Sequence, residues 1–164
     1  MVYGANPYRE FYIMASDVAK DNSTEADVKR LLPYRGDFLL IDKILLIEPE
    51  HKIVTQKHIN GNEWYIKNHY PDNPIMPGHV TAEAMLQTCA LFLEDIDEKG
   101  KERTIYLSSS KTRFFKVVRP GDTLIITAYP TRIISGMGIF KAEARVKDKL
   151  VAKSQFTLKV ETST

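Results

Sequence analysis

Two side chains that can transfer protons, His69 and Glu83, stand fourteen residues apart in this sequence of 164 residues. A histidine near its ordinary pKa can accept a proton at neutral pH, and apolar surroundings favour the neutral, proton-donating form of a carboxyl group. The two residue types therefore suit general acid–base catalysis. Each also has a structural interpretation: His69 as a hydrogen-bonded histidine of a proline-rich loop, and Glu83 as a carboxylate paired with a buried base or with Gln87 one helical turn later.

The sequence around His69 indicates a stiff loop that leads into a buried helix. Pro71, Pro74 and Pro77 recur at every third residue, and each proline fixes its own φ and restricts the residue before it. Residues 80–93 are apolar nearly all round, which is typical of a helix enclosed by other elements. The run is too short and too polar at Glu83 to span a membrane. We therefore expect a rigid loop that presents His69 and a core helix that carries Glu83.

The remaining sequence predicts strands joined by short turns. Sequential strands with such short links should pair antiparallel, because parallel pairing needs a crossover of a dozen or more residues. The expected class is α+β, a curled antiparallel sheet of about six strands wrapped round the long apolar helix. The expected helices cover residues 24–32 and 78–96, and the expected strands cover residues 38–47, 51–59, 103–118, 123–134, 136–146 and 150–160, with 61–67 as a connection.

Length and composition fit one domain with a short extension. We place the extension at residues 1–23, with a helix compatible with the pattern over 8–20, and the domain at 24–164. The net charge of +2 gives no reason to expect nucleic acid as a partner. The single cysteine, Cys89, excludes an intramolecular disulfide and fits a reducing, cytoplasmic setting. Neither a secretory signal nor a membrane anchor is expected near the N-terminus.

Several separated motifs resemble the FabZ-type 3-hydroxyacyl-acyl carrier protein dehydratases, a family with the hotdog fold. The resemblance covers roughly residues 25–160. The motifs that carry it are Leu32-Pro33-Tyr34-Arg35, Leu39-Leu40-Ile41-Asp42, His69-Tyr70-Pro71-Asp72-Asn73-Pro74-Ile75-Met76-Pro77-Gly78, Glu83-Ala84, Gln87, Lys111-Thr112-Arg113-Phe114 and Val118-Arg119-Pro120-Gly121-Asp122.

The resemblance implies an activity and a set of roles. The protein would remove water from 3-hydroxyacyl chains on acyl carrier protein, with His69 as the base and Glu83 as the acid, or with His69 handling the proton while Glu83 holds water. His69 of one protomer would meet Glu83 of the neighbour across a twofold interface, in a homodimer or a trimer of dimers. The backbone amides of Gly78 and His79 would bind the thioester oxygen. Neither a metal nor a cofactor is expected.

A basic cluster follows the helix, formed by Lys111, Arg113, Lys116 and Arg119. By resemblance, such residues receive the acidic carrier protein and the phosphate of its pantetheine arm. A strand edge protected by charge explains the pattern equally well. Along a strand, Lys111 and Arg113 share one face and Lys116 takes the other, so the cluster need not form one patch.

The sequence departs from the family pattern at four places, which are Asn68, Tyr34, Gly36-Asp37 and His79. Asn68 and His79 flank the expected site and bear on the substrate and the acyl pocket rather than on the reaction type. Two other functions rank below dehydration: a hotdog acyl thioesterase, and a non-catalytic acyl-binding or assembly subunit. Glu83, where isomerising relatives generally carry aspartate, argues weakly for dehydration only.

Overall fold

The structure is a computed structural model that describes residues 23–48, 50–93, 103–134 and 136–162. The helix compatible with residues 8–20 lies outside the described residues. The short helix α2 (Glu25–Leu31) begins where expected, because Thr24 caps it and exchanges hydrogen bonds with Asp27. Ser23 then ties this end to the sheet, since its hydroxyl bonds both the amide and the carbonyl of Ile44, at 2.6 and 2.8 Å.

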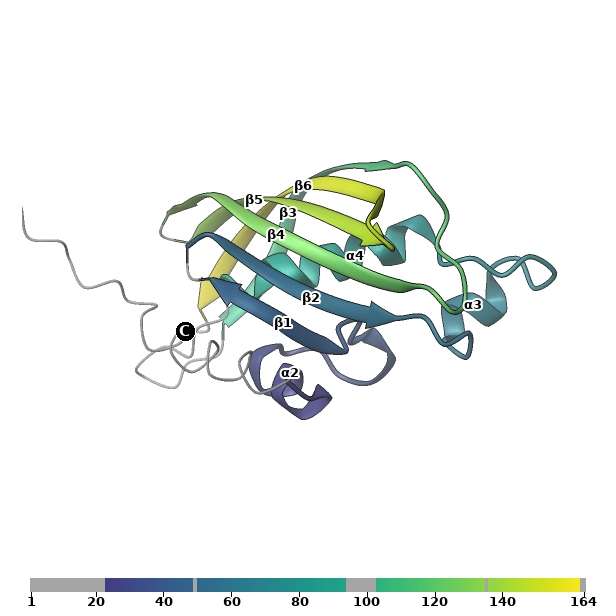
Figure 1. Cartoon of the computed structure of the whole chain (residues 1–164). Helices are drawn as coiled ribbons and strands as arrows, with labels where there is room; N and C mark the ends of the chain where they lie inside the picture. The colour runs from purple at the N-terminus through teal and green to yellow at the C-terminus, as the bar shows by residue number, and fades with distance from the viewer. Residues whose placement is uncertain (1–22, 49, 94–102, 135, 163–164) are drawn as a thin grey trace, which may run out of the picture.

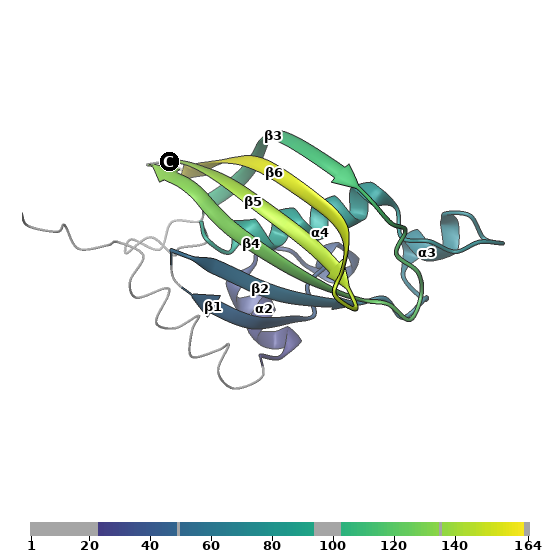
Figure 2. The same cartoon turned by 45° about the horizontal axis from the view of Figure 1, so that its top comes forward.

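The core of the domain is the helix α4 (Gly78–Ala90), enclosed by a curled sheet (Figures 1 and 2). Nine of its residues are buried, and it contacts β2, β3, β4, β5 and β6. Cys89 is fully buried within it. The prediction of an apolar helix wrapped by an antiparallel sheet is confirmed. Among the described residues, no helix is long and apolar enough to cross a membrane.

The sheet has six strands in the order β1-β2-β4-β5-β6-β3, and every neighbouring pair is antiparallel. The strands are β1 (Lys43–Glu48), β2 (Lys52–His58), β3 (Arg103–Phe114), β4 (Thr123–Ile134), β5 (Met137–Val146) and β6 (Lys149–Thr162). The expectation that sequential strands pair is wrong for β3 and β4. β3 instead pairs with β6 at the edge of the sheet, because residues 115–122 carry the chain past the end of the sheet to β4 beside β2.

Two connections differ from the prediction. Residues 38–42 were expected to begin the first strand, but Gly36–Phe38 form a 3-10 turn, η1, and the strand begins at Lys43. The physical reason is Gln87. Its side chain accepts a hydrogen bond from the amide of Leu40 and donates one to the carbonyl of Phe38, so these backbone groups do not pair with a neighbouring strand. Within the expected connection 61–67, the helix α3 (Trp64–Asn68) forms.

The helix α3 positions the start of the loop that carries His69. Glu63 precedes the helix and accepts hydrogen bonds from the amides of Asn60 and Gly61, both at 2.8 Å. At the other end the Asn68 side chain donates to the carbonyl of Trp64 at 2.9 Å. The loop then projects from one end of the domain and returns to the start of α4 (Figure 1).

Candidate active site

His69 is fixed by a carbonyl of its own loop. Nδ1 of His69 lies 3.1 Å from the carbonyl oxygen of Ile75, so the ring must carry its proton on Nδ1 to donate this bond. Nε2 is then the basic nitrogen of the neutral ring. The side chain is half-buried. The loop therefore selects the tautomer in which Nε2 can accept a proton.

Tyr70 shapes the loop directly after His69. It has a φ of 55°, in the left-handed region, which costs a non-glycine residue about 1 kcal/mol. The turn closes through the amide of Asn73, which donates to the Tyr70 carbonyl at 2.8 Å. The Tyr70 ring lies against the His69 imidazole, with 4.2 Å between ring centroids. Backbone geometry and ring contact together restrict the orientation of the imidazole.

Glu83 lies on α4 in a largely apolar setting. Burial raises the pKa of its carboxyl group, and the hydrogen bond from Gln87 acts in the opposite direction but is the smaller effect. Nε2 of Gln87 donates to Oε1 of Glu83 at 3.1 Å, which matches the pairing one turn later that the sequence suggested. The surroundings therefore favour a neutral carboxyl group that can donate a proton.

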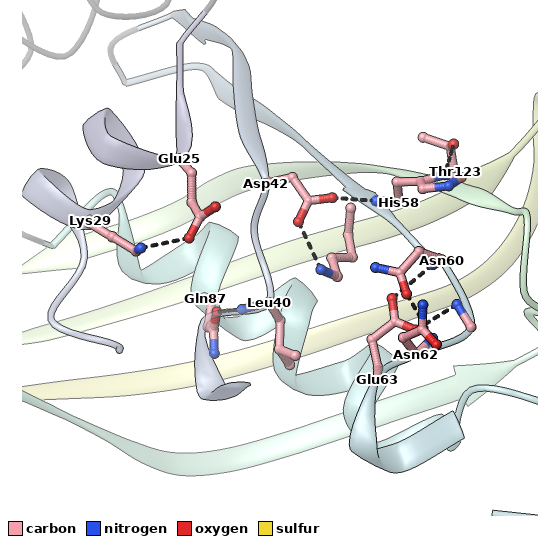
Figure 3. A network of polar contacts seen from close by, with 12 residues as sticks. Glu25, Lys29, Leu40, Asp42, His58, Asn60, Asn62, Glu63, Gln87 and Thr123 are labelled. Carbon is pink, nitrogen blue, oxygen red and sulfur yellow. Dashed lines mark hydrogen bonds and ion pairs between the residues drawn. The ribbon is translucent and has the colours of Figure 1, made fainter. Parts of the chain in front are cut away.

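Gln87 is itself held from three directions. It is fully buried, accepts from the amide of Leu40 at 2.9 Å, and donates to the carbonyl of Phe38 at 2.8 Å as well as to Glu83. Figure 3 shows the side chain of Gln87 reaching Leu40. These bonds orient the amide so that its NH₂ group faces the carboxyl group of Glu83.

The first amides of α4 point out of the helix start. The amides of Val80 and Thr81 bond to the carbonyl of Pro77, but those of Gly78 and His79 have no acceptor within the described residues. The His79 side chain is exposed, which agrees with a solvated first-turn residue. Gly78 lies so close to Phe114 that a Cβ there would be 3.1 Å from the ring. A side chain at this position would require the Phe114 ring to shift, so glycine favours this close approach of β3 to the helix start.

The basic residues do not form one patch. Lys111 and Arg113 face away from α4, because Thr112 between them bonds the buried hydroxyl of Ser154 at 2.7 Å on the inner face. Arg113 lies opposite Lys153 of β6. Lys116 is exposed beyond the end of β3. Arg119 is separate from these residues, since its guanidinium group bonds the loop that carries His69.

Lys153 is a basic residue that the sequence analysis missed. Its Nζ lies 5.8 Å from the centroid of the Phe115 ring, and the Arg113 guanidinium lies 5.5 Å from the same centroid. Two like charges directly opposite each other on neighbouring strands repel. The positions of Arg113 and Lys153 therefore favour contact with an anionic group. The alternation of buried and exposed residues along β6 is the signal that could have assigned its face, but only the register with β3 places it beside Arg113.

A polar cavity of about 350 Å³ opens elsewhere, between the η1 region, β2 and α3. Figure 3 labels some of its lining residues, among them Asp42, Asn60 and Glu63. Lys57 and Asp42 form an ion pair of 2.8 Å in its wall. Neither His69 nor Glu83 lines it.

No hydrogen bond or ion pair joins His69 to Glu83 among the described residues of one chain. In the part of the chain that the structure describes, no group of three His, Cys, Asp or Glu residues could hold a metal ion.

Comparison with known proteins places this geometry in a family. Residues 32–155 match the FabA-like domain. The chain belongs to the FabA-like family. The 3-hydroxyacyl-[acyl-carrier-protein] dehydratase FabZ of Thermoanaerobacter pseudethanolicus is 37% identical over 79% of this chain and 91% of its own length. The FabZ dehydratase of Chloroflexus aggregans is 36% identical over 82% of this chain and 93% of its own length.

Solved structures agree on the fold. The dehydratase heterocomplex ApeI:P from Xenorhabdus doucetiae superposes with a TM-score of 0.71 at 15% identity, over 82% of this chain and 90% of that chain. The TT0310 protein from Thermus thermophilus gives 0.58 at 17% identity, over 77% and 98%. The FabZ-type resemblance and the hotdog fold predicted from sequence are thus confirmed. The catalytic roles of His69 and Glu83 and the thioester-binding role of the Gly78 and His79 amides stay predictions.

Proposed function

We propose that the protein dehydrates 3-hydroxyacyl chains on acyl carrier protein to trans-2-enoyl chains in fatty-acid or related lipid synthesis. The observation that carries the proposal is the carbonyl of Ile75 on Nδ1 of His69, 3.1 Å away, which leaves Nε2 as the base. Family membership supplies the substrate class, because the FabZ relatives are named as 3-hydroxyacyl-[acyl-carrier-protein] dehydratases.

In the proposed reaction, His69 and Glu83 divide the two proton transfers. Nε2 of His69 takes the proton from carbon 2 of the acyl chain, and the electron pair left behind forms the double bond to carbon 3. The hydroxyl on carbon 3 leaves as water after accepting the proton of Glu83. Burial supports this role for Glu83, because it favours the protonated carboxyl group that the step needs.

The start of α4 would stabilise the charge that develops on the thioester. Removal of the carbon 2 proton shifts negative charge to the thioester oxygen. The amides of Gly78 and His79, which have no acceptor among the described residues, are donors suited to that oxygen. The positive end of the helix dipole adds to the effect.

The edge of the sheet supports assembly as a dimer. β3 is twelve residues long and lies at the edge of the sheet. Among the described residues, its backbone pairs with β6 along one edge and with no strand along the other. Tyr106 and Leu107 on this strand are 47% and 50% exposed. A long edge strand offers a row of unpaired N–H and C=O groups to which another chain can pair. We infer that β3 pairs with a second copy, in a homodimer or a trimer of dimers, and that His69 of one copy faces Glu83 of the other.

The outer face of β3 would receive the carrier protein. Lys111 and Arg113 share this face, Lys116 follows them, and Lys153 enlarges the positive surface. Such a surface would speed encounter with an acidic partner and its phosphate more than it would strengthen the complex. The cytoplasmic location expected from the single cysteine stays a prediction.

Mass spectrometry of carrier-bound substrate tests the proposal. Wild-type protein should interconvert 3-hydroxyacyl and trans-2-enoyl carrier protein, and His69→Ala and Glu83→Gln should each lower the rate by about 10²- to 10⁴-fold. Release of a free acyl chain would instead identify a thioesterase. No interconversion by wild type, or wild-type rates in both variants, would overturn the assignment.

A further inference from the structure

The turn after β3 lies against the loop that carries His69. The carbonyl of Val118 accepts a hydrogen bond of 2.8 Å from the amide of Met76. Nη1 of Arg119 donates to Oδ1 of Asn73 at 2.7 Å and to the carbonyl of Pro74 at 3.4 Å. Two consecutive residues of the turn therefore hold the stretch from Asn73 to Met76.

This stretch contains the carbonyl that fixes His69. Ile75, which accepts the proton on Nδ1 of His69, lies between Pro74 and Met76, and both neighbours are bonded to the turn. Rotation of the peptide group of Ile75 would disturb at least one of these bonds. The position of the acceptor for His69 thus depends on contacts from outside the loop.

The turn is a firm support for these contacts. The amide of Arg119 donates to Oδ2 of Asp122 at 2.8 Å, and the amide of Asp122 donates back to the carbonyl of Arg119 at 3.0 Å. Ile59, just after β2, exchanges two further backbone bonds with Gly121 and Asp122, at 2.7 and 2.9 Å. Because the turn is bonded to the sheet, Arg119 connects a rigid part of the domain to the His69 loop.

We propose that Arg119 is a positioning residue for His69, acting through Asn73 and the Pro74–Met76 stretch. This inference rests on the proposed function of His69 and differs from the sequence-based grouping of Arg119 with the carrier-binding residues. Arg119 reaches the loop with a charge-assisted bond to the Asn73 amide oxygen. A lysine could keep the charge, but it lacks the rigid planar guanidinium group whose Nη1 contacts both acceptors.

Kinetics with two substrates separates positioning from carrier docking. Arg119→Ala and Asn73→Ala are assayed with a 3-hydroxyacyl carrier protein and with the matching N-acetylcysteamine thioester, which has no carrier. We expect each variant to lower kcat by about tenfold on both substrates, with KM changed by less than about twofold, because a misplaced base affects the chemical step. The double variant should lose no more than either single variant, since the residues act as one unit.

Arg119→Lys should recover part of the lost kcat, and Arg145→Ala provides a matched control. Arg145 is also exposed but bonds Glu143 and the carbonyl of Asp148 at the β5–β6 turn, so we expect wild-type kinetics. Nitrogen NMR of the His69 ring adds a readout that does not depend on turnover. Wild type should show the Nδ1-protonated tautomer, and Arg119→Ala should show a mixture.

The outcomes are distinct. A higher KM confined to carrier-bound substrate would overturn the proposal and assign Arg119 to docking, and so would unchanged kinetics on both substrates. An unchanged tautomer in Arg119→Ala would also overturn it. If wild-type protein acts on neither substrate, the proposed function fails, and the tautomer measurement still decides whether Arg119 orients the ring.

Discussion

The side-chain amide of Gln87 holds one oxygen of Glu83, with 3.1 Å between Nε2 and Oε1, and leaves Oε2 without a partner among the described residues. Because Gln87 is also bonded to Phe38 and Leu40, it cannot turn to follow the carboxyl group. The arrangement orients Glu83 without giving it a positive partner. Partial burial of this carboxyl group raises its pKa, which shifts its equilibrium toward the protonated form.

Glu83→Gln should stabilise the folded protein at neutral pH. The raised pKa of Glu83 means that its contribution to stability is fully present below pH 4.5 or so, the ordinary value, and is lost as the pH rises through the folded-state pKa. The glutamine keeps the acceptor for Gln87 and never ionises. Urea unfolding at pH 4 and pH 7 should show a gain in the free energy of unfolding at pH 7 that shrinks at pH 4. An equal effect at both pH values would contradict the raised pKa.

Gln87→Ala should destabilise the protein by about 2–4 kcal/mol, because it leaves the buried amide of Leu40 and the part-buried carbonyl of Phe38 without their partner. Chemical denaturation measures the loss. Gln155→Ala, on the exposed outer face of β6, serves as the matched control and should change stability by less than about 0.5 kcal/mol. Similar effects of the two substitutions would show that the buried bonds contribute little.

Lys111→Glu combined with Arg113→Glu should raise the apparent KM for carrier-bound substrate by about tenfold and leave kcat nearly unchanged, because charge on this face guides the encounter. The effect should weaken at high salt. Lys43→Glu, exposed on β1 at the opposite edge of the sheet, should leave KM unchanged. An unchanged KM in the double variant would remove the outer face of β3 from the docking surface.

Leu107→Lys should weaken self-association by about tenfold or more, because it places a charge on the exposed edge strand that we expect to pair with a second copy. Sedimentation at several concentrations measures the dissociation constant. Leu45→Lys makes the same change on β1, where the side chain is 42% exposed at the other edge. Dimers equally stable in both variants would place the interface elsewhere.

Local signals in the sequence predicted much of this fold. The apolar run after Pro77 indicated α4, and the Pro120-Gly121-Asp122 turn gave the start of β4 correctly. Residues that act on distant segments could not be recognised in the same way. The side chain of Gln87 bonds the backbone of Phe38 and Leu40, so these residues do not join a strand. A pattern of apolar residues does not indicate such a long-range hydrogen bond.

The site shows the same division. The residue types of His69 and Glu83 are compatible with proton transfer, and the resemblance to the dehydratases supplies the prediction of that role. Burial explains the raised pKa of Glu83. The acceptor for His69 is a backbone carbonyl, at Ile75, and no residue type reveals which carbonyl a loop will present. The contact of Arg119 with Asn73 joins positions 46 residues apart, so only the fold brings it into view.

The pairing of β3 with β6 also sets an order for biosynthesis. β3 ends at Phe114, but its partner in the sheet is not made until the ribosome has translated Lys149–Thr162. Through that interval the backbone N–H and C=O groups of β3 have no partner strand, and a chain with such an unpaired strand is prone to aggregate. Chaperone dependence during synthesis should therefore fall sharply once the β6 segment has left the ribosomal tunnel.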